Sequence, residues 1–281
     1  MHNMPKKYYA LFTLPTIIAF AIAFLIPFLY GIFLSFTSFR TVTDITWVGF
    51  SNYVRAFTDD NNFIHALWFT VRFAIVSLIL INLVAFALAL LLTGGVKGTN
   101  FFRTVFFMPN LIGGIVLGYI WQLLINGILL NFGVDLTYSA KYGFWGLIVL
   151  MNWQQAGYMM VIYIAAIQSI PTEMTEAAKI DGANGWQIIR NITVPMVMPA
   201  ITICTFLTVT NSFKLFDQNL ALTAGAPARE SAMLALDIYT TFYGRVGYEG
   251  VGQAKAVVFS LIVALIVILQ MRLTRTKEVE R

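Results

Sequence analysis

Long apolar blocks separated by short polar segments dominate this sequence. Each block approaches or exceeds the roughly 20 residues with which a helix crosses about 30 Å of hydrocarbon. The pattern predicts an all-α, polytopic membrane protein, with six transmembrane helices in a single domain over residues 1–281. We expect the spans at about 11–36, 66–92, 105–125, 144–170, 197–222 and 254–269.

The first block follows Lys6 and Lys7, an arrangement that also begins secretion signals. Its apolar run is too long for such a signal, and the A-x-A pattern at Ala19–Ala21 falls in the middle of the block. We therefore expect an uncleaved first span.

The amino-acid composition excludes several classes of protein and site. The chain has 59% apolar and 11% charged residues, against roughly half and a quarter in globular domains. The net charge of +5 comes from basic residues between and beyond the blocks, so we expect no nucleic-acid partner. Cys204 is the single cysteine and lies inside a block, which excludes an intrachain disulfide and predicts a buried apolar residue.

Charge also bears on orientation. Six spans place both termini on one side, and cytoplasmic termini leave ten Lys and Arg inside and seven outside or at the outer edge. This bias favours cytoplasmic termini. Three connections are then long: 171–195 inside, and 40–62 and 223–252 outside. The outer connections mix aromatic and turn residues, which fits either a partner arriving from outside or anchoring at the membrane surface.

The inner connection begins with a predicted short helix. Pro171 suits the start of a helix, Thr172 is a candidate cap, and Gly182 ends the helix or permits a sharp turn. A small apolar surface that can enter a groove is formed by Ala177, Ala178 and Ile180 beside Glu176 and Asp181.

A second short helix is predicted by Trp186, Ile189 and Ile192, which recur at helical spacing, and we expect Pro195 to close it. Taken alone, this periodicity also fits an amphipathic segment that rests on the bilayer surface.

The order of residue types in this connection identifies its function more specifically than its periodicity does. The pattern E-A-A-x-x-D-G-A, followed by I-x-x-P, resembles the cytoplasmic signature loop of ABC importer permeases. The resemblance implies that the first short helix is a coupling helix, which docks into a cleft of the ATP-hydrolysing subunit. The implied coupling residues are Glu176, Ala177, Ala178, Asp181, Gly182 and Ala183.

Motifs along nearly the whole chain resemble the maltose-transporter type of carbohydrate permease, and specifically the first, F-type, of its two permease subunits. They are Leu14-Pro15, Pro27–Tyr30, Val48–Tyr53, Phe102–Pro109, Ala166–Pro171, Phe216-Asp217 and Leu222–Pro227. The chain departs from the family at Ala224 and Ala226, where glycine is frequent, and this puts details of that loop in question.

The resemblance also implies partners and a location. We expect a second related permease subunit in a heterodimer, two ATP-binding cassette subunits, an external solute-binding protein and membrane lipid. The expected location is the bacterial plasma (inner) membrane, with several spans.

Chemistry within the chain is not expected. A phosphate loop needs G-x-x-x-x-G-K-[ST], and Gly94–Gly98 has the wrong spacing. His65 belongs to no H-E-x-x-H pattern, and no span carries paired carboxylates. We therefore expect a non-catalytic subunit that holds no metal and no cofactor, with ATP and Mg bound by the partner subunits.

Polar residues inside spans should face the bundle interior or a water-filled path. The fourth block places amides beside aromatic residues, which suits sugar hydroxyls and ring C–H surfaces. The resemblance maps solute contacts onto Asn110, Gly114, Gln155, Asn211 and Ser212. The whole candidate path is Asn110, Gly114, Gln154, Gln155, Tyr158, Asn211 and Ser212.

Each of these side chains has an alternative role in an interhelical hydrogen bond that holds the bundle together. Lys214 and Asp217 are three residues apart and are expected to pair within a helix, in a structural or gating role.

The sequence thus predicts a permease subunit that forms half of an alternating-access path for a carbohydrate or similar polar solute. An ion-coupled secondary transporter is one alternative, although the spans contain no acidic relay. A non-transporting membrane assembly subunit is the other. Sugars, polyols and glycerol phosphates all remain candidate solutes.

Overall fold

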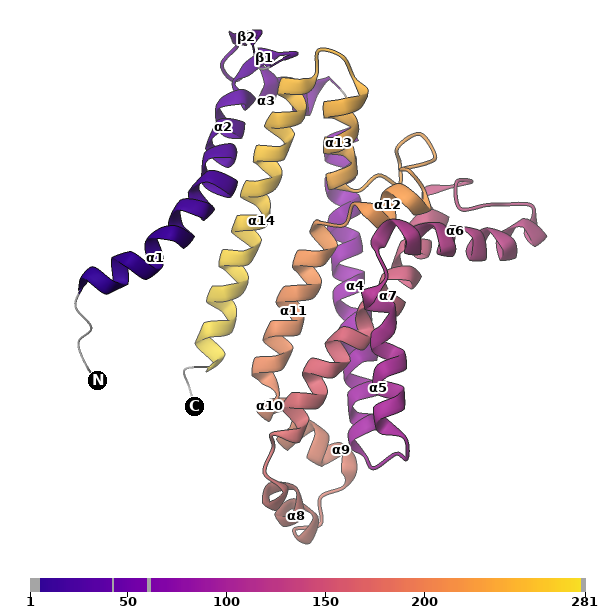
Figure 1. The fold of residues 1–281 in the computed structure, drawn as a ribbon. Helices are drawn as coiled ribbons and strands as arrows, with labels where there is room; N and C mark the ends of the chain where they lie inside the picture. The colour runs from indigo at the N-terminus through magenta and orange to yellow at the C-terminus, as the bar shows by residue number, and fades with distance from the viewer. Residues whose placement is uncertain (1–5, 42, 60–61, 279–281) are drawn as a thin grey trace. The chain divides into compact units, whose positions relative to one another are not determined.

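The computed structural model describes residues 6–41, 43–59 and 62–278. Five helices in this part of the chain are long and apolar enough to cross a membrane. A bent pair, Gly185–Met196 with Met198–Phe213, makes a sixth span if it is counted as one. The predicted mostly helical, multi-pass fold is therefore confirmed (Figure 1). The cytoplasmic placement of the termini concerns residues 1–5 and 279–281, which lie outside the described residues.

Contacts divide the chain into two compact units. Unit 1 consists of Met1–Phe63 and Ile238–Leu261. Unit 2 consists of Ile64–Asp237 and Ile262–Arg281.

Unit 1 begins with an apolar helical rod. Helix α1 (Lys6–Phe20) continues through a π-helical turn at Ala21–Leu25 into α2 (Ile26–Ser35). Only 6% of the apolar window in Thr13–Ser35 is buried within the chain, so this stretch offers most of its surface to its surroundings. That exposure is expected of a helix whose solvent is lipid.

An antiparallel hairpin follows the rod. Strand β1 (Thr37–Phe39) pairs with β2 (Ile45–Trp47), and α3 (Ser51–Thr58) comes next. The buried Asn52 amide donates to the carbonyls of Ser35 at 3.0 Å and Thr37 at 2.8 Å, which ties α3 to the end of α2. The hairpin is a small departure from the all-helical prediction.

Unit 2 is built around the fourth predicted span. Helix α7 (Ala140–Gln168) has 61% of its apolar window buried, more than any other candidate span in the described chain. It packs against α4 (Asn62–Thr93), α5 (Thr99–Phe107) and α11 (Met198–Phe213). Its core side chains include Leu147, Leu150, Met151, Met159, Met160 and Tyr163.

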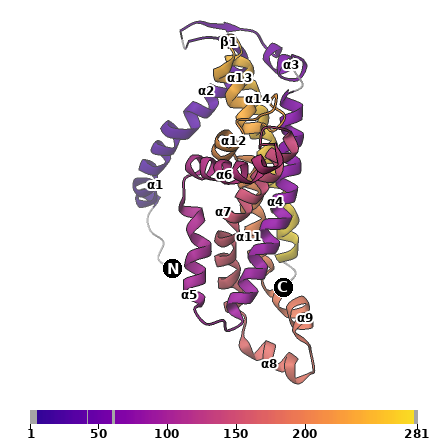
Figure 2. The same ribbon diagram turned by 90° about the vertical axis from the view of Figure 1, so that its right-hand side faces the viewer.

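The third predicted span, 105–125, is broken in the structure. Helix α5 ends at Phe107, a 3-10 turn covers Met108–Leu111, and α6 (Gly114–Leu129) runs crosswise to α5 (Figures 1 and 2). Pro109 lacks an N–H and so cannot continue the hydrogen-bond pattern of α5, and the backbone becomes extended at Ile112. A 3-10 turn at Leu130–Phe132 closes α6.

The fifth predicted span, 197–222, is also too long. Helix α11 stops at Phe213, and a separate helix α12 (Asp217–Leu222) packs on α6. Lys214 and Asp217 therefore lie on opposite sides of a break, and the predicted intrahelical pair is wrong. Ion pairs between described residues include Arg55–Asp59 and Arg229–Asp237.

The last two helices extend beyond their predicted limits or lie outside the six spans. Helix α13 (Leu234–Gly244) was not expected, and α14 (Glu249–Glu278) begins before and ends after the predicted 254–269. In unit 1, Lys255 of α14 is only 2% exposed, and its Nζ donates to Thr241 Oγ1 at 2.9 Å. Cys204 of unit 2 is buried, as predicted.

Candidate functional site

The segment between α7 and α11 projects from the ends of these helices (Figures 1 and 2). It contains α8 (Thr172–Ile180), α9 (Gly185–Ile188), a π-helical turn at Ile189–Thr193 and α10 (Val194–Met196). No residue of α8 is buried. We call residues 172–196 the projecting segment.

The turn between α8 and α9 is closed by backbone and side-chain hydrogen bonds. Gly182 has φ +85°, and its amide donates to the Lys179 carbonyl at 3.1 Å. The Ala183 amide donates to the Ala178 carbonyl at 2.9 Å, which completes a Schellman motif. The prediction that Gly182 ends the first helix is confirmed.

Helix α9 has its own cap. Asn184 accepts from the Gln187 amide at 2.9 Å, and the Asn184 amide donates to the Gln187 side chain at 2.7 Å. This reciprocal capping box satisfies two N–H groups at the helix start. The two short helices are therefore joined by a turn of defined geometry.

Two expectations about the segment's ends are wrong. Thr172 is the first residue of α8 and Pro171 occupies the cap position, with no side-chain cap bond. The second helical stretch also runs through Pro195 to Met196 and ends at Val197. The π-helical turn just before Pro195 changes the hydrogen-bond pattern, which allows the proline to be accommodated.

The predicted coupling residues lie on this projecting segment. Glu176, Ala177, Asp181 and Gly182 are exposed, whereas Ala178 and Ala183 are half-buried. The neighbouring Ile180 is 87% exposed and Trp186 is 67% exposed. Large apolar side chains gathered at one projecting turn are typical of a surface that binds another protein. A role of these residues in binding an ATPase stays a prediction.

Among the predicted path residues, Gln154 closes the break between α5 and α6. Its Nε2 donates to the Ile112 carbonyl at 3.3 Å, and its Oε1 accepts from Gln218 Nε2 at 2.9 Å. Because Gln154 is only 5% exposed, the structure favours an interhelical role for it.

Two other path residues meet directly. Asn211 Nδ2 of α11 donates to Gln155 Oε1 of α7 at 3.2 Å, and both side chains are half-buried. Ser212 is completely buried, and its hydroxyl donates to the Thr208 carbonyl one turn earlier at 2.8 Å. The Gln155–Asn211 pair therefore keeps accessible polar surface, while Ser212 is held within its own helix.

The remaining path residues surround the broken third span. Asn110 lies half-buried in the turn before α6. Tyr158 of α7 is half-buried, with its ring 6.3 Å from the Phe107 ring. A side chain at Gly114 would meet the Asp217 and Gln218 side chains at 2.7 and 3.0 Å, so this glycine permits close packing of α12 on α6.

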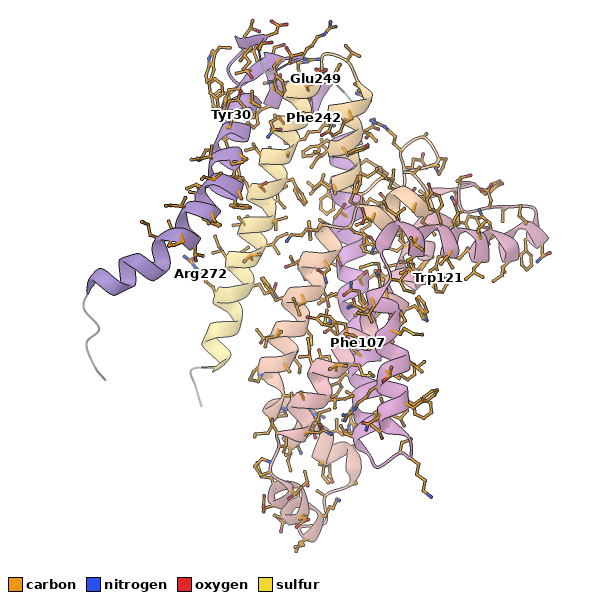
Figure 3. The ribbon with its side chains drawn as sticks, viewed as in Figure 1. Tyr30, Phe107, Trp121, Phe242, Glu249 and Arg272 are labelled. Atoms are coloured by element: carbon orange, nitrogen blue, oxygen red, sulfur yellow. The ribbon has the colours of Figure 1, made fainter. Side chains whose placement is uncertain are left out.

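A cavity of about 310 Å³ lies beside α4, α5 and α7. Most of its lining is apolar, and Asn152 and Trp153 add an amide and an indole. The centroid of the Trp153 ring lies 5.6 Å from the centroid of the Trp121 ring of α6. Trp121 is labelled in Figure 3, as is Phe107 at the end of α5. Aromatic faces beside amide groups suit a solute with both C–H surfaces and hydroxyls.

Sequence reasoning missed a partly buried chain of polar side chains in unit 2. The Tyr163 hydroxyl donates to Asn82 Oδ1 at 2.7 Å, and Asn82 Nδ2 donates to Thr208 Oγ1 at 3.2 Å. These bonds join α7, α4 and α11. A lone asparagine inside the second apolar block was the available signal, because a polar side chain in hydrocarbon needs a partner.

Sequence reasoning also missed the hydrogen bonds that hold the connection after α12. Buried Asn219 donates to the Ser231 carbonyl at 2.9 Å and accepts from the Met233 amide at 2.8 Å. Ala224, which stands where the resembled family often has glycine, has φ +49°. Glycine is favoured at such a position because it has no Cβ to clash.

The apolar helices, the broken third span and the projecting segment are those of a multi-pass membrane protein. Residues 94–278 match the family described as binding-protein-dependent transport system inner membrane component. The chain belongs to this family.

Relatives match the chain over almost its full length. It is 44% identical over 282 residues to the probable starch degradation products transport system permease protein AmyD of Thermoanaerobacterium thermosulfurigenes, covering 97% of this chain and 96% of that one. It is 28% identical to the multiple sugar-binding transport system permease protein MsmF of Streptococcus mutans, covering 95% of both chains.

The fold is shared with a solved transporter. A chain of a bacterial ABC transporter involved in the import of the acidic polysaccharide alginate superposes with a TM-score of 0.80. The match covers 96% of both chains at 23% sequence identity. The predicted ABC permease fold is thereby confirmed.

Proposed function

We propose that this chain forms half of the translocation path of an ATP-driven carbohydrate importer, with oligosaccharides derived from starch as the first candidate solutes. Support for the solute class comes from the relative that shares 44% of its residues and is named for starch degradation products. The mixed aromatic and amide residues near the broken third span fit such a solute.

The observation that carries the proposal is the projecting segment. Its turn is fixed by the Schellman motif and the capping box, yet α8 has no packing partner within the described chain that buries any of its residues. A rigid element of this kind can transmit a displacement to α7 and α11, to which it is directly joined. We infer that α8 docks on a partner ATPase subunit.

The proposal also includes the remaining parts of the importer. Two ATP-binding cassette subunits would bind ATP and Mg, and a second related permease would complete the path. An external solute-binding protein would deliver the carbohydrate. Closure of the ATPases would move the projecting segments of the two permeases together and turn the path outward, and ATP hydrolysis would reset it.

Charge reversal on α8 tests the docking. In the intact transporter reconstituted in liposomes, Glu176→Arg should reduce both uptake of maltooligosaccharide and solute-stimulated ATP hydrolysis at least tenfold, because an exposed carboxylate at a docking surface becomes a repulsive cation. Solute binding by the external protein should not change. The control is Asp44→Arg, which reverses an exposed carboxylate in the turn between β1 and β2.

Uptake and ATP hydrolysis at wild-type rates in Glu176→Arg would contradict docking through α8. Transport of an unrelated solute by the wild-type complex, with no response to maltooligosaccharide, would contradict the solute class alone.

A further inference from the structure

A second cavity, of about 440 Å³, opens between the early turns of α4 and α7 in unit 2. Its polar lining comes from His65 and Arg72 on α4, Lys141 on α7 and Glu230 in the connection after α12. Phe69 and Phe144 form an apolar floor, with their rings packed edge to face at 5.6 Å. No residue of the candidate solute path lines this cavity.

The charges on α4 place the cavity at a definite depth in the membrane. The helix carries no charged residue between Phe73 and Thr93. This run is about 31 Å long at 1.5 Å per residue, which matches the roughly 30 Å of hydrocarbon in a bilayer. Arg72 therefore lies at the boundary between hydrocarbon and headgroups.

An apolar track continues from the cavity along the hydrocarbon part of α4. Ile75, which lines the cavity, is 54% exposed. Ile79 and Leu83 follow at intervals of four residues and are 58% and 62% exposed. Side chains four residues apart share one face of a helix, so these three form a continuous surface for an acyl chain.

The polar part of the cavity matches an anionic headgroup. Arg72, Lys141 and Glu230 together carry a formal charge of +1, which one phosphodiester neutralises. Arg72 Nε donates to the Trp68 carbonyl at 3.4 Å, which directs the guanidinium along the helix surface. The Glu230 carboxylate can accept hydrogen bonds from headgroup hydroxyls.

We propose that this cavity binds one molecule of phosphatidylglycerol, with the phosphate held by Arg72 and Lys141, the glycerol headgroup beside Glu230, and an acyl chain along Ile75, Ile79 and Leu83. The site sits on the helices that flank the solute path, but it is separate from that path.

Native mass spectrometry of the intact transporter, titrated with phosphatidylglycerol in detergent, tests this site. One tightly bound lipid per copy of this chain is expected. Arg72→Gln and Lys141→Gln should each weaken its apparent Kd about fivefold, since a basic residue near an anionic headgroup contributes about 1 kcal/mol. The control Lys97→Gln removes an exposed cation from the turn after α4 and should leave the Kd unchanged.

A second variant keeps all the charges. Ile75→Trp should fill the cavity beside the track and abolish the tight binding, and because Ile75 is exposed the chain should still fold. Equal binding of phosphatidylethanolamine or of inorganic phosphate, or an unchanged Kd in the Arg72→Gln, Lys141→Gln double variant, would overturn the proposal.

Discussion

The contact between α5 and α7 depends on the absence of one side chain. A Cβ at Gly157 would overlap the backbone carbonyl of Phe106. The backbone of α5 would have to move, because a carbonyl group cannot rotate away as a flexible side chain does. Small residues permit this kind of close approach between helices in membranes.

Gly157→Ala should therefore destabilise the permease by about 1–3 kcal/mol, the usual cost of overpacking. Thermal unfolding of the purified transporter in detergent measures this change. Gly127→Ala is the matched control, because a Cβ at Gly127 on α6 meets nothing within 4 Å. Equal midpoints for the two variants would show that α5 does not pack on α7 as described.

A pH effect is expected at Asp59 in unit 1. Its carboxylate accepts from Arg55 Nε at 3.0 Å and from the Tyr248 hydroxyl at 3.1 Å. The hydrogen bond from Arg55 is the main cause that lowers the pKa of Asp59 below its ordinary 3.8. A lowered pKa means that the contact stabilises the fold at and above pH 3.8 and is lost as the pH falls through the lowered value.

NMR titration of the Asp59 carboxyl group should give a midpoint below 3.8 in the wild-type protein. Arg55→Gln should raise this midpoint toward the ordinary value, while uptake between pH 6 and 8 should not respond to the titration, since the carboxylate stays ionised throughout. A midpoint that is unaffected by Arg55→Gln would show that Arg55 does not lower the pKa of Asp59.

The chemical character of individual residues could be predicted from the sequence better than their hydrogen-bond partners could. The end of the first short helix at Gly182 was predicted correctly, because glycine favours the left-handed backbone that follows a helix. Gln154 and Ser212 were selected because they are polar in apolar blocks, but burial directs them toward Ile112 and Thr208. Only the folded chain decides whether such a side chain meets a neighbouring helix or an open path.

At the scale of elements, the turn between α8 and α9 decides how the projecting segment is held. Gly182→Val should place a branched side chain at φ +85°, where L-residues cost about 1–2 kcal/mol, and should reduce ATP-driven uptake. Gly182→Asn should retain more uptake, because asparagine tolerates left-handed backbone. Transport assays in liposomes compare the two, and equal activities would show that the turn's conformation is unimportant.

Two of the six predicted spans failed for a common reason. Hydropathy measures whether residues are apolar and does not register where a helix stops, so 105–125 and 197–222 were each taken as continuous. The stops had local signals: Pro109 and the Gly113–Gly114 pair in one, and charged Lys214 and Asp217 in the other. Uninterrupted helices such as α4 carry no such signals and were located well.

At the scale of the molecule, the source of energy separates an ATP-driven importer from an ion-coupled one. Uptake by the full transporter in liposomes should require ATP inside the vesicle and continue at an unchanged rate when an ionophore collapses the proton and sodium gradients. The physical reason is that the described spans of this chain provide no chain of acidic residues to carry ions. Uptake that stops with the ionophore while ATP remains would contradict the proposal.

The corner at Ile112 limits what can surround this chain. Like every helix, α6 begins with backbone N–H groups that have no carbonyl four residues earlier within the helix to donate to. Lipid hydrocarbon offers these N–H groups no hydrogen-bond acceptor. A non-helical backbone within the membrane is stable only where protein or water covers it. That flank of the permease is therefore unfit for bare lipid, and a neighbouring subunit or a wet vestibule must close it.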